Sequence, residues 1–265
     1  MEVLGYFLSI LVGISLGLIG SGGSILTVPI LVYILAINPV VATAYSLFVV
    51  GSTALVGGIQ NAIQKKVDFK TVVIFGIPSI IAVYITRAFI LPIIPLEIVQ
   101  IGGLIITKDI FLMLLFAIVM ILASMSMIKQ KKNSADSKEQ LITYNYPMIL
   151  LEGSLVGVLT GLVGAGGGFL IIPALVILAK MPMRLAVGTS LFIIAIKSLL
   201  GFLGDIKTGL EVDWNFLILF TMFSVIGIFI GTYLLKKIPN EKLKIAFGWF
   251  VLIMGFYIIF KELII

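Results

Sequence analysis

The chain has 265 residues, of which 61% are hydrophobic and 11% are charged, and its mean hydropathy is +1.27. This composition excludes a water-soluble globular domain and indicates a polytopic membrane protein. Cysteine and histidine are both absent, which excludes disulfides, Cys/His metal sites, thiol nucleophiles and imidazole proton relays. The formal net charge is +6, but the charges lie in short connections between apolar runs, so we expect no nucleic-acid partner.

The chain divides into ten apolar segments when charges, prolines and glycines are taken as boundaries. A bilayer core about 30 Å thick needs about 20 helical residues per crossing. The N-terminus lacks the basic region of a cleavable signal peptide, so we expect its apolar segment to stay in the mature protein. The expected segments are 4–20, 24–36, 40–64, 71–91 and 111–128 in the first half, and 149–164, 168–179, 185–204, 214–235 and 245–260 in the second.

A glycine-rich stretch occurs once in each half. Residues 17–29 read GLIGSGGSILTVP and residues 161–173 read GLVGAGGGFLIIP, so that seven of the thirteen positions are identical. The same offset superimposes the first three segments of the two halves. We therefore predict a first repeat at 1–128, a basic linker at 129–146 and a second repeat at 147–265.

Lysine and arginine in short loops predict the orientation, because cytoplasmic loops are enriched in them. The basic loops 65–70, 129–146, 180–184 and 236–244 should be cytoplasmic, whereas loops 36–40 and 205–213 should face outward. Repeat-equivalent loops thus lie on opposite sides. This pattern predicts an inverted repeat in the inner cell membrane.

The segments around each glycine stretch are short. Residues 5–20 and 24–36 would form helices of about 24 Å and about 20 Å. Each pair is therefore either a re-entrant hairpin with its glycine tip inside the membrane or two short, steep crossings, and we favour the hairpin. The predicted fold is all-α, with two inverted repeats that each contain a Gly-tipped short helical hairpin and three transmembrane helices. The two tips would meet near the midplane.

The glycine tips are the candidate binding site. Helix-breaking glycines free backbone N–H groups, which inside a membrane must be buried in protein or line a watery cavity. The helix that follows each tip, which begins either at the glycines or at Pro29 and Pro173, would point its positive end at the same place. The alternative is close helix packing through small residues. The predicted anion-binding residues are Gly20, Ser21, Gly22, Gly23 and Ser24 in the first tip, and Gly164, Ala165, Gly166, Gly167 and Gly168 in the second.

Polar residues at helical spacing follow each hairpin. This polar seam contains Ser46 and Thr53 in the first half and their equivalents Ser190 and Lys197 in the second, with Thr189 beside Ser190. We expect the seam to line the same cavity as the tips, although Ser and Thr also form interhelical hydrogen bonds. Lys197 lies about twelve residues into its segment, where a lysine costs about 3 kcal/mol, so we predict that it holds an anionic substrate.

The remaining ionisable residues of the apolar segments are few. Arg87 is interpreted as an interfacial anchor. Glu152 and Asp205 are the candidates for coupling to a proton or a sodium ion. We expect no metal, no cofactor and no enzymatic activity, because the inventory of nucleophiles and bases is thin.

The repeated glycine and proline motifs, together with the sequence AVGTSL at 186–191 and its fainter copy ATAYSL at 42–47, resemble the TauE/SafE sulfite exporter family. Ser24 and Tyr45 depart from the second-half pattern of Gly168 and Thr189. The resemblance implies a secondary transporter that exports sulfite or organosulfonates, and we expect it to act by alternating access at a midplane site. The alternatives are another small anion such as a carboxylate or thiosulfate, a channel, or a structural membrane protein.

Overall fold

The structure is a computed structural model that describes residues 2–20, 24–101, 104–128, 146–177, 181–234 and 240–264. Each of the ten predicted segments contains a helix, which confirms the all-α fold class. Sequence analysis predicted no strands, but a short antiparallel pair, β1 and β2, lies between α5 and α6. The elements are α1 (Glu2–Ile19), α2 (Ser24–Pro29), α3 (Pro39–Ile63), α4 (Phe69–Ile85), α5 (Leu91–Ile93), β1 (Glu97–Ile101), β2 (Leu104–Thr107), α6 (Lys108–Ile128), α7 (Tyr146–Val163), α8 (Gly168–Ile177), α9 (Met183–Lys207), α10 (Trp214–Leu234) and α11 (Asn240–Ile264), with π-helical turns at Ile30–Ile34 and Thr86–Ile90.

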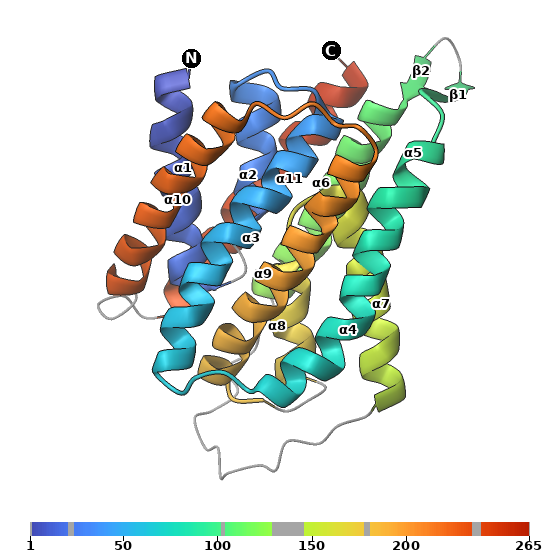
Figure 1. Cartoon of the computed structure of the whole chain (residues 1–265). Coiled ribbons are helices and arrows are strands. Elements are labelled where there is room, and N and C mark those ends of the chain that lie inside the picture. The colour runs from blue at the N-terminus through green and yellow to red at the C-terminus, as the bar shows by residue number, and fades with distance from the viewer. Residues whose placement is uncertain are drawn as a thin grey trace.

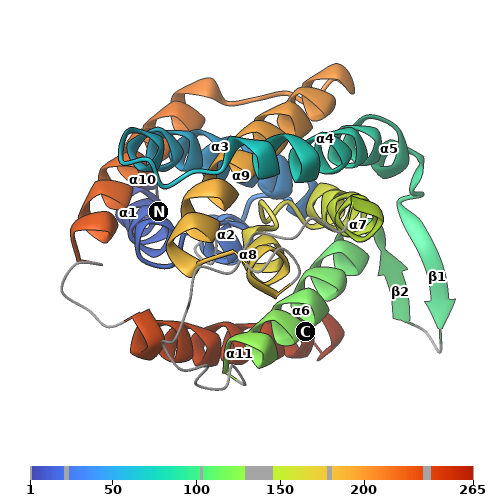
Figure 2. The ribbon, with the colours of Figure 1, turned by 90° about the horizontal axis from the view of Figure 1, so that it is seen from below.

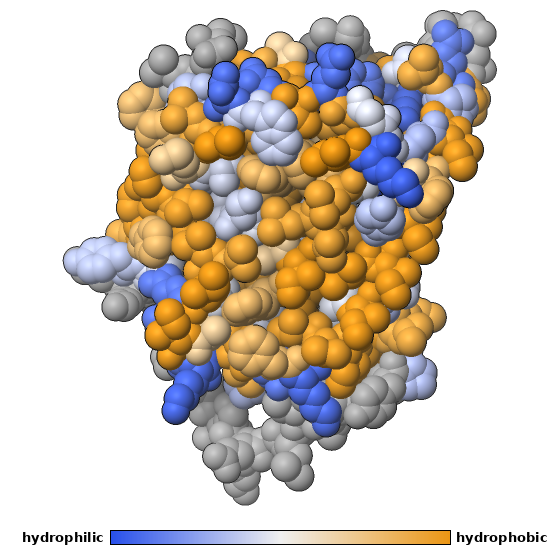
Figure 3. All heavy atoms as spheres, in the orientation of Figure 1, coloured by the Kyte–Doolittle hydropathy of each residue, from blue (hydrophilic) through white to orange (hydrophobic). Residues whose placement is uncertain are grey.

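The surface of the bundle is apolar where a lipid bilayer would contact it. Figure 3 shows a hydrophobic band across the middle of the molecule, with hydrophilic residues gathered at its upper and lower ends. Five described helices are long and apolar enough to cross a membrane, and they cover residues 39–63, 69–93, 108–125, 185–207 and 214–234. Large apolar side chains such as Ile63, Leu151 and Ile253 point outward, whereas many Ser and Thr side chains are buried. The protein is therefore a multi-pass membrane protein.

The helices pack in pairs, and exchanging equivalent helices of the two halves leaves the set of pairs unchanged. Helix α1 packs on α10 as its equivalent α7 packs on α4, while α3 packs on its own equivalent α9, and α6 on α11. Equivalent helices also run in opposite directions: in Figure 1, α3 descends and α9 ascends. A two-fold relation between the halves would produce both features. The sidedness of the loops in a bilayer stays a prediction.

The short hairpin helices α2 and α8 lie in the centre of the bundle, in contact with one another and surrounded by the longer helices (Figure 2). Helices α1 and α7 have 18 residues each, or about 27 Å, against about 37 Å for the 25 residues of α3. Each therefore ends before it has spanned the length of α3. This geometry places the glycine stretches inside the protein.

Close packing of small residues joins the hairpins to the outer helices. In α1, a Cβ on Gly17 would lie 2.5 Å from the backbone oxygen of Ile228 in α10. In α7, a Cβ on Gly161 would lie 2.6 Å from Cβ of Thr86. The first glycine of each repeated motif is thus a packing residue, as the small-residue alternative proposed. The glycines of the tips lie one turn further along and have different contacts.

Candidate functional site

The second glycine tip, residues 164–168, is a buried turn between α7 and α8. Gly164, Gly166 and Gly167 have φ angles of +72°, +64° and +62°, a left-handed conformation that only glycine adopts readily. The N–H of Gly164 donates to the carbonyl of Thr160, and the N–H of Leu170 donates to the carbonyl of Gly167. Helix α8 begins at Gly168, the last residue of the tip, and Pro173 lies inside it.

The first glycine tip, residues 20–24, is described in part. Ser21, Gly22, Gly23 and the side chain of Ser24 lie outside the described residues. Gly20 has a φ of +77° and is buried. Helix α2 begins at Ser24, and Pro29 is its last residue before a π-helical turn. Both following helices thus begin at the glycines.

Each tip contacts the beginning of the third helix of the other half. A Cβ on Gly20 would lie 2.7 Å from Cγ1 of Val187 in α9, and a Cβ on Gly164 would lie 2.5 Å from Cβ of Thr43 in α3. Val187 and Thr43 are equivalent positions of the two repeats. The two tips therefore make equivalent contacts, and each contact holds a tip against the opposite half of the protein.

Lys197 places its charge at the second tip. Its side chain is fully buried, and Nζ donates a 3.0 Å hydrogen bond to Oγ1 of Thr160 in α7. A Cβ on Gly167 would lie 2.8 Å from the same Nζ atom. Within the described residues, no carboxylate forms an ion pair with this lysine. The ammonium group therefore has a neutral partner and does not reach an interface by snorkelling.

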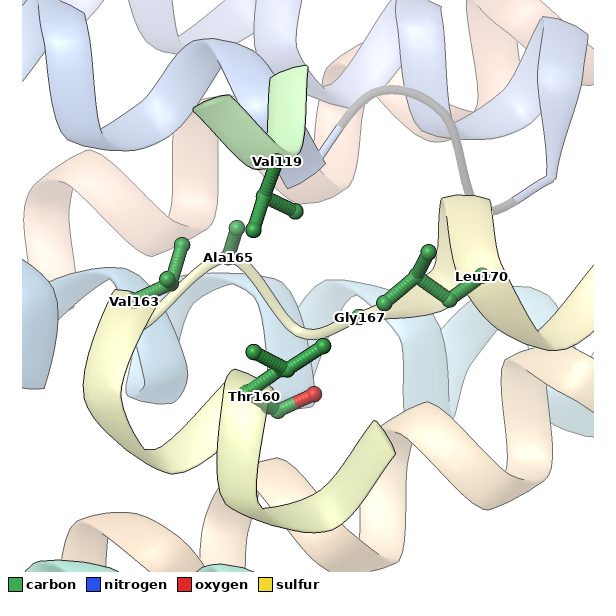
Figure 4. Close-up of a pocket in the computed structure, with 7 residues that line it drawn as sticks. Val119, Thr160, Val163, Ala165, Gly167 and Leu170 are labelled. Atoms are coloured by element: carbon green, nitrogen blue, oxygen red, sulfur yellow. The ribbon is translucent and has the colours of Figure 1, made fainter. Parts of the chain in front are cut away.

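A narrow gap lies beside Thr160 and Gly167, the two residues that lie next to the ammonium group of Lys197. Figure 4 shows apolar side chains from α6, α7 and α8 around it. It holds about 160 Å³ of empty space, but it is too narrow to admit a water molecule. An anion therefore does not fit into this gap in the present conformation. The lining residues are Val119, Leu159, Thr160, Val163, Ala165, Gly167 and Leu170.

Thr189 and its equivalent Tyr45 lie elsewhere and fix the loops that precede α4 and α10. The hydroxyl of Thr189 accepts a 2.9 Å hydrogen bond from the N–H of Asp68, and the hydroxyl of Tyr45 accepts a 2.7 Å bond from the N–H of Asp213. Asp68 caps α4, and the carboxylate of Asp213 accepts from Phe216 N at the start of α10. The Thr-to-Tyr departure noted in the sequence thus keeps the same contact with a longer side chain.

The other seam residues have mixed contacts. Thr53 donates a 3.0 Å hydrogen bond to Ser224 of α10, which is the interhelical role given as the alternative. Ser190 donates to the carbonyl of Val187 in its own helix. The hydroxyl of Ser46 is buried without a partner in the described part of the chain. Of the seam residues, Lys197 is the one whose side chain reaches a described tip.

Arg87 is a functional candidate that sequence analysis missed. Its side chain is fully buried, and Nη1 lies 3.3 Å from Oδ1 of Asp205 in α9 and 3.1 Å from Oγ1 of Thr43. The interpretation of Arg87 as an interfacial anchor is therefore wrong. Gly204 makes the burial possible, since a Cβ there would lie 3.0 Å from Cβ of Arg87. The available signal was an arginine within one predicted span and an acid directly after the end of another.

The two coupling candidates differ in their surroundings. Asp205 is buried and forms an ion pair with Arg87. Glu152 lies in α7, is partly exposed, and has no polar partner among the residues described. The structure brings Asp205 close to the second tip through Arg87 and Thr43, but it gives no such connection for Glu152.

A family model described as "Sulfite exporter TauE/SafE" matches residues 6–258. The chain belongs to this family. Similar proteins include a "Probable membrane transporter protein" of Xylella fastidiosa (strain 9a5c), 30% identical over 95% of this chain and 92% of that protein. The "Probable membrane transporter protein YunE" of Bacillus subtilis (strain 168) is 27% identical over 96% of both chains. No solved structure is significantly similar. With the apolar helices, these matches make this TauE/SafE protein a membrane transporter.

Proposed function

We propose that this TauE/SafE protein is a secondary transporter that exports small sulfur-containing oxyanions, such as sulfite or organosulfonates, across the inner cell membrane. The observation that carries the proposal is the fully buried ammonium group of Lys197 beside Gly167 of the second tip. The family description supports the substrate class.

The chemistry of the site favours a small anion. An ammonium group has three N–H donors, and Thr160 accepts from one of them. A positive charge in a low-dielectric interior is stabilised strongly by an anion, and charge-assisted hydrogen bonds are about twice as strong as neutral ones. We infer that the substrate bridges Lys197 and tip amides.

Alternating access is supported by the closed gap and by the reciprocal contacts of the tips. The gap beside Thr160 is closed in this conformation, so binding requires movement of a hairpin or of α9. Each tip contacts the opposite half, so movement of one half relative to the other would open one side of the site. A proton or sodium gradient would drive the cycle, with Glu152 and Asp205 as the candidate coupling residues.

The test is uptake into proteoliposomes that contain the purified full chain. Sulfite, sulfoacetate, taurine, sulfate, thiosulfate and acetate are supplied with and without a pH gradient or a sodium gradient. We expect saturable transport of sulfite or a sulfonate, and its loss in Lys197→Met. The control is Lys207→Met, which makes the same substitution at an exposed position of the same helix.

Two results would contradict the proposal in different ways. Transport of acetate without any sulfur anion would keep the scaffold and replace the substrate class. Sulfite transport that is equal in Lys197→Met and Lys207→Met would remove Lys197 from the site.

A further inference from the structure

Only one of the three nitrogen atoms of the Arg87 guanidinium group has a hydrogen-bond partner in the described part of the chain. Its Nη1 atom donates to Thr43 and contacts Asp205, whereas Nε and Nη2 are buried without a partner in the described part of the chain. These two atoms form one edge of the planar group. That edge matches two oxygen atoms of an oxyanion, which it can bind with two parallel hydrogen bonds. A buried donor without an acceptor is unfavourable, so the edge favours a ligand.

The contact between Arg87 and Asp205 is a weak version of such a pair. One nitrogen and one oxygen meet at 3.3 Å, and Oδ2 of Asp205 has no partner among the described residues. An optimal arginine–carboxylate pair is bidentate, with distances of about 2.7–2.9 Å. Asp205 therefore neutralises the charge of Arg87 without filling its hydrogen-bonding positions.

Arg87 is connected to the second glycine tip through one residue. Thr43 accepts the hydrogen bond from Arg87, and its Cβ and backbone pack against Gly164, the first residue of the tip. Lys197 lies at Gly167, near the other end of the same tip. Two buried cations, one from the π-helical turn after α4 and one from α9, thus flank a turn of five residues. No such pair flanks Gly20 in the described part of the first tip.

We propose that Arg87 is a second anion-binding residue, which holds an oxyanion through its Nε and Nη2 atoms, and that Asp205 is an internal counter-anion that competes with the substrate for this arginine. The proposal rests on the proposed function and deepens it. An oxyanion would pass between Lys197 and Arg87 along the second tip, and Asp205 would reclaim Arg87 when the anion leaves. The planar edge also selects for ligands with two oxygens over halides.

The test measures anion binding to the purified full chain by isothermal titration calorimetry, with sodium sulfite as the oxyanion and sodium chloride as the halide. Arg87→Lys keeps the charge but loses the bidentate edge, so we expect sulfite affinity to fall at least about tenfold while chloride affinity changes little. Asp205→Asn removes the competing charge and should raise sulfite affinity.

Folding is controlled by a second variant that leaves no unpaired charge. The double substitution Arg87→Met with Asp205→Leu replaces both partners by apolar groups, a change that buried ion pairs often tolerate. We expect it to fold and to lose the tight binding of sulfite. A pair with a purely structural role predicts wild-type affinity in this variant.

The outcomes separate this inference from the proposed function. If the wild type binds sulfite and the double variant binds it equally well, the Arg87 site is refuted while the proposed function stands. If Asp205→Asn binds sulfite more weakly than the wild type, Asp205 is not a competitor. If the wild type neither binds nor transports any anion of the panel, the proposed function fails, and this inference fails with it.

Discussion

The substitution Gly167→Ala tests the contact between the second tip and Lys197. A Cβ at position 167 would overlap Oγ1 of Thr160 and would lie 2.8 Å from Nζ of Lys197. The methyl group would therefore overlap both the donor and the acceptor of the 3.0 Å hydrogen bond. At least one of the two side chains must move, and we expect the hydrogen bond to be lost.

Two contributions determine the cost. Alanine at a φ of +62° costs about 1–2 kcal/mol, because its Cβ crowds the backbone in the left-handed region. Loss of a hydrogen bond to a charged group costs about 1.5–3 kcal/mol. We therefore expect Gly167→Ala to lower the free energy of unfolding by about 2.5–5 kcal/mol and to abolish transport.

The matched control is Gly209→Ala. Gly209 has a similar φ of +84°, but a Cβ there would meet nothing within 4 Å. It should lose only the conformational contribution, about 1–2 kcal/mol. Unfolding in mixed micelles with increasing SDS, followed by circular dichroism, gives both values. The difference between the two variants measures the contact with Lys197 and Thr160.

A double-mutant cycle tests whether the cost of Gly167→Ala comes from the contact with Thr160 and Lys197. In a Thr160→Ala background the overlap with Oγ1 is gone and only the contact with the flexible end of Lys197 remains, so the added cost of Gly167→Ala should fall toward the conformational contribution. Equal destabilisation by Gly167→Ala and Gly209→Ala, or an unchanged cost in the Thr160→Ala background, would show that the tip does not constrain Lys197.

Two further predictions concern the scaffold. Gly13→Ala should destabilise the protein by about 1–3 kcal/mol, because its Cβ would overlap the backbone oxygen of Ser224 and push α1 away from α10. Gly76→Ala, whose Cβ would only make an ordinary 3.9 Å contact with Ile80, should be close to neutral in the same SDS titration, and equal costs would contradict the packing argument. Tyr45→Phe should cost about 0.5–1.5 kcal/mol, because the N–H of Asp213 loses its acceptor. Faster hydrogen exchange at that amide is the expected signature, and unchanged exchange would argue against the contact.

Several features of the fold were predictable because the membrane restricts the choices. Apolar runs of about 20 residues have to be helices in a bilayer, since their backbone groups have no other partners. The repeated motif at 17–29 and 161–173 identified equivalent segments, and these form equivalent helices. The β1–β2 pair was missed because residues 97–107 have no strong alternation and lie between two predicted spans.

The candidate site was predictable in part. Lys197 was identified by its position within an apolar run, and the structure places it at the second tip. Thr53 and Thr189 were grouped with it by helical spacing, but spacing does not distinguish a cavity from a neighbouring helix or loop. Thr53 in fact contacts Ser224 of α10, and Thr189 contacts Asp68. Residues on the same face can therefore have unrelated partners.

The sequence by itself determined that this protein lies in a membrane, that its helices come in two equivalent sets, and that glycines interrupt both sets at matched positions. Hydropathy and repetition are local properties of the chain, so they are visible without the fold. Only the tertiary structure decided that Arg87 is buried against Asp205 and that Lys197 meets Thr160. These contacts join residues 118 and 37 positions apart, and burial of a charge depends on which partner the fold brings to it.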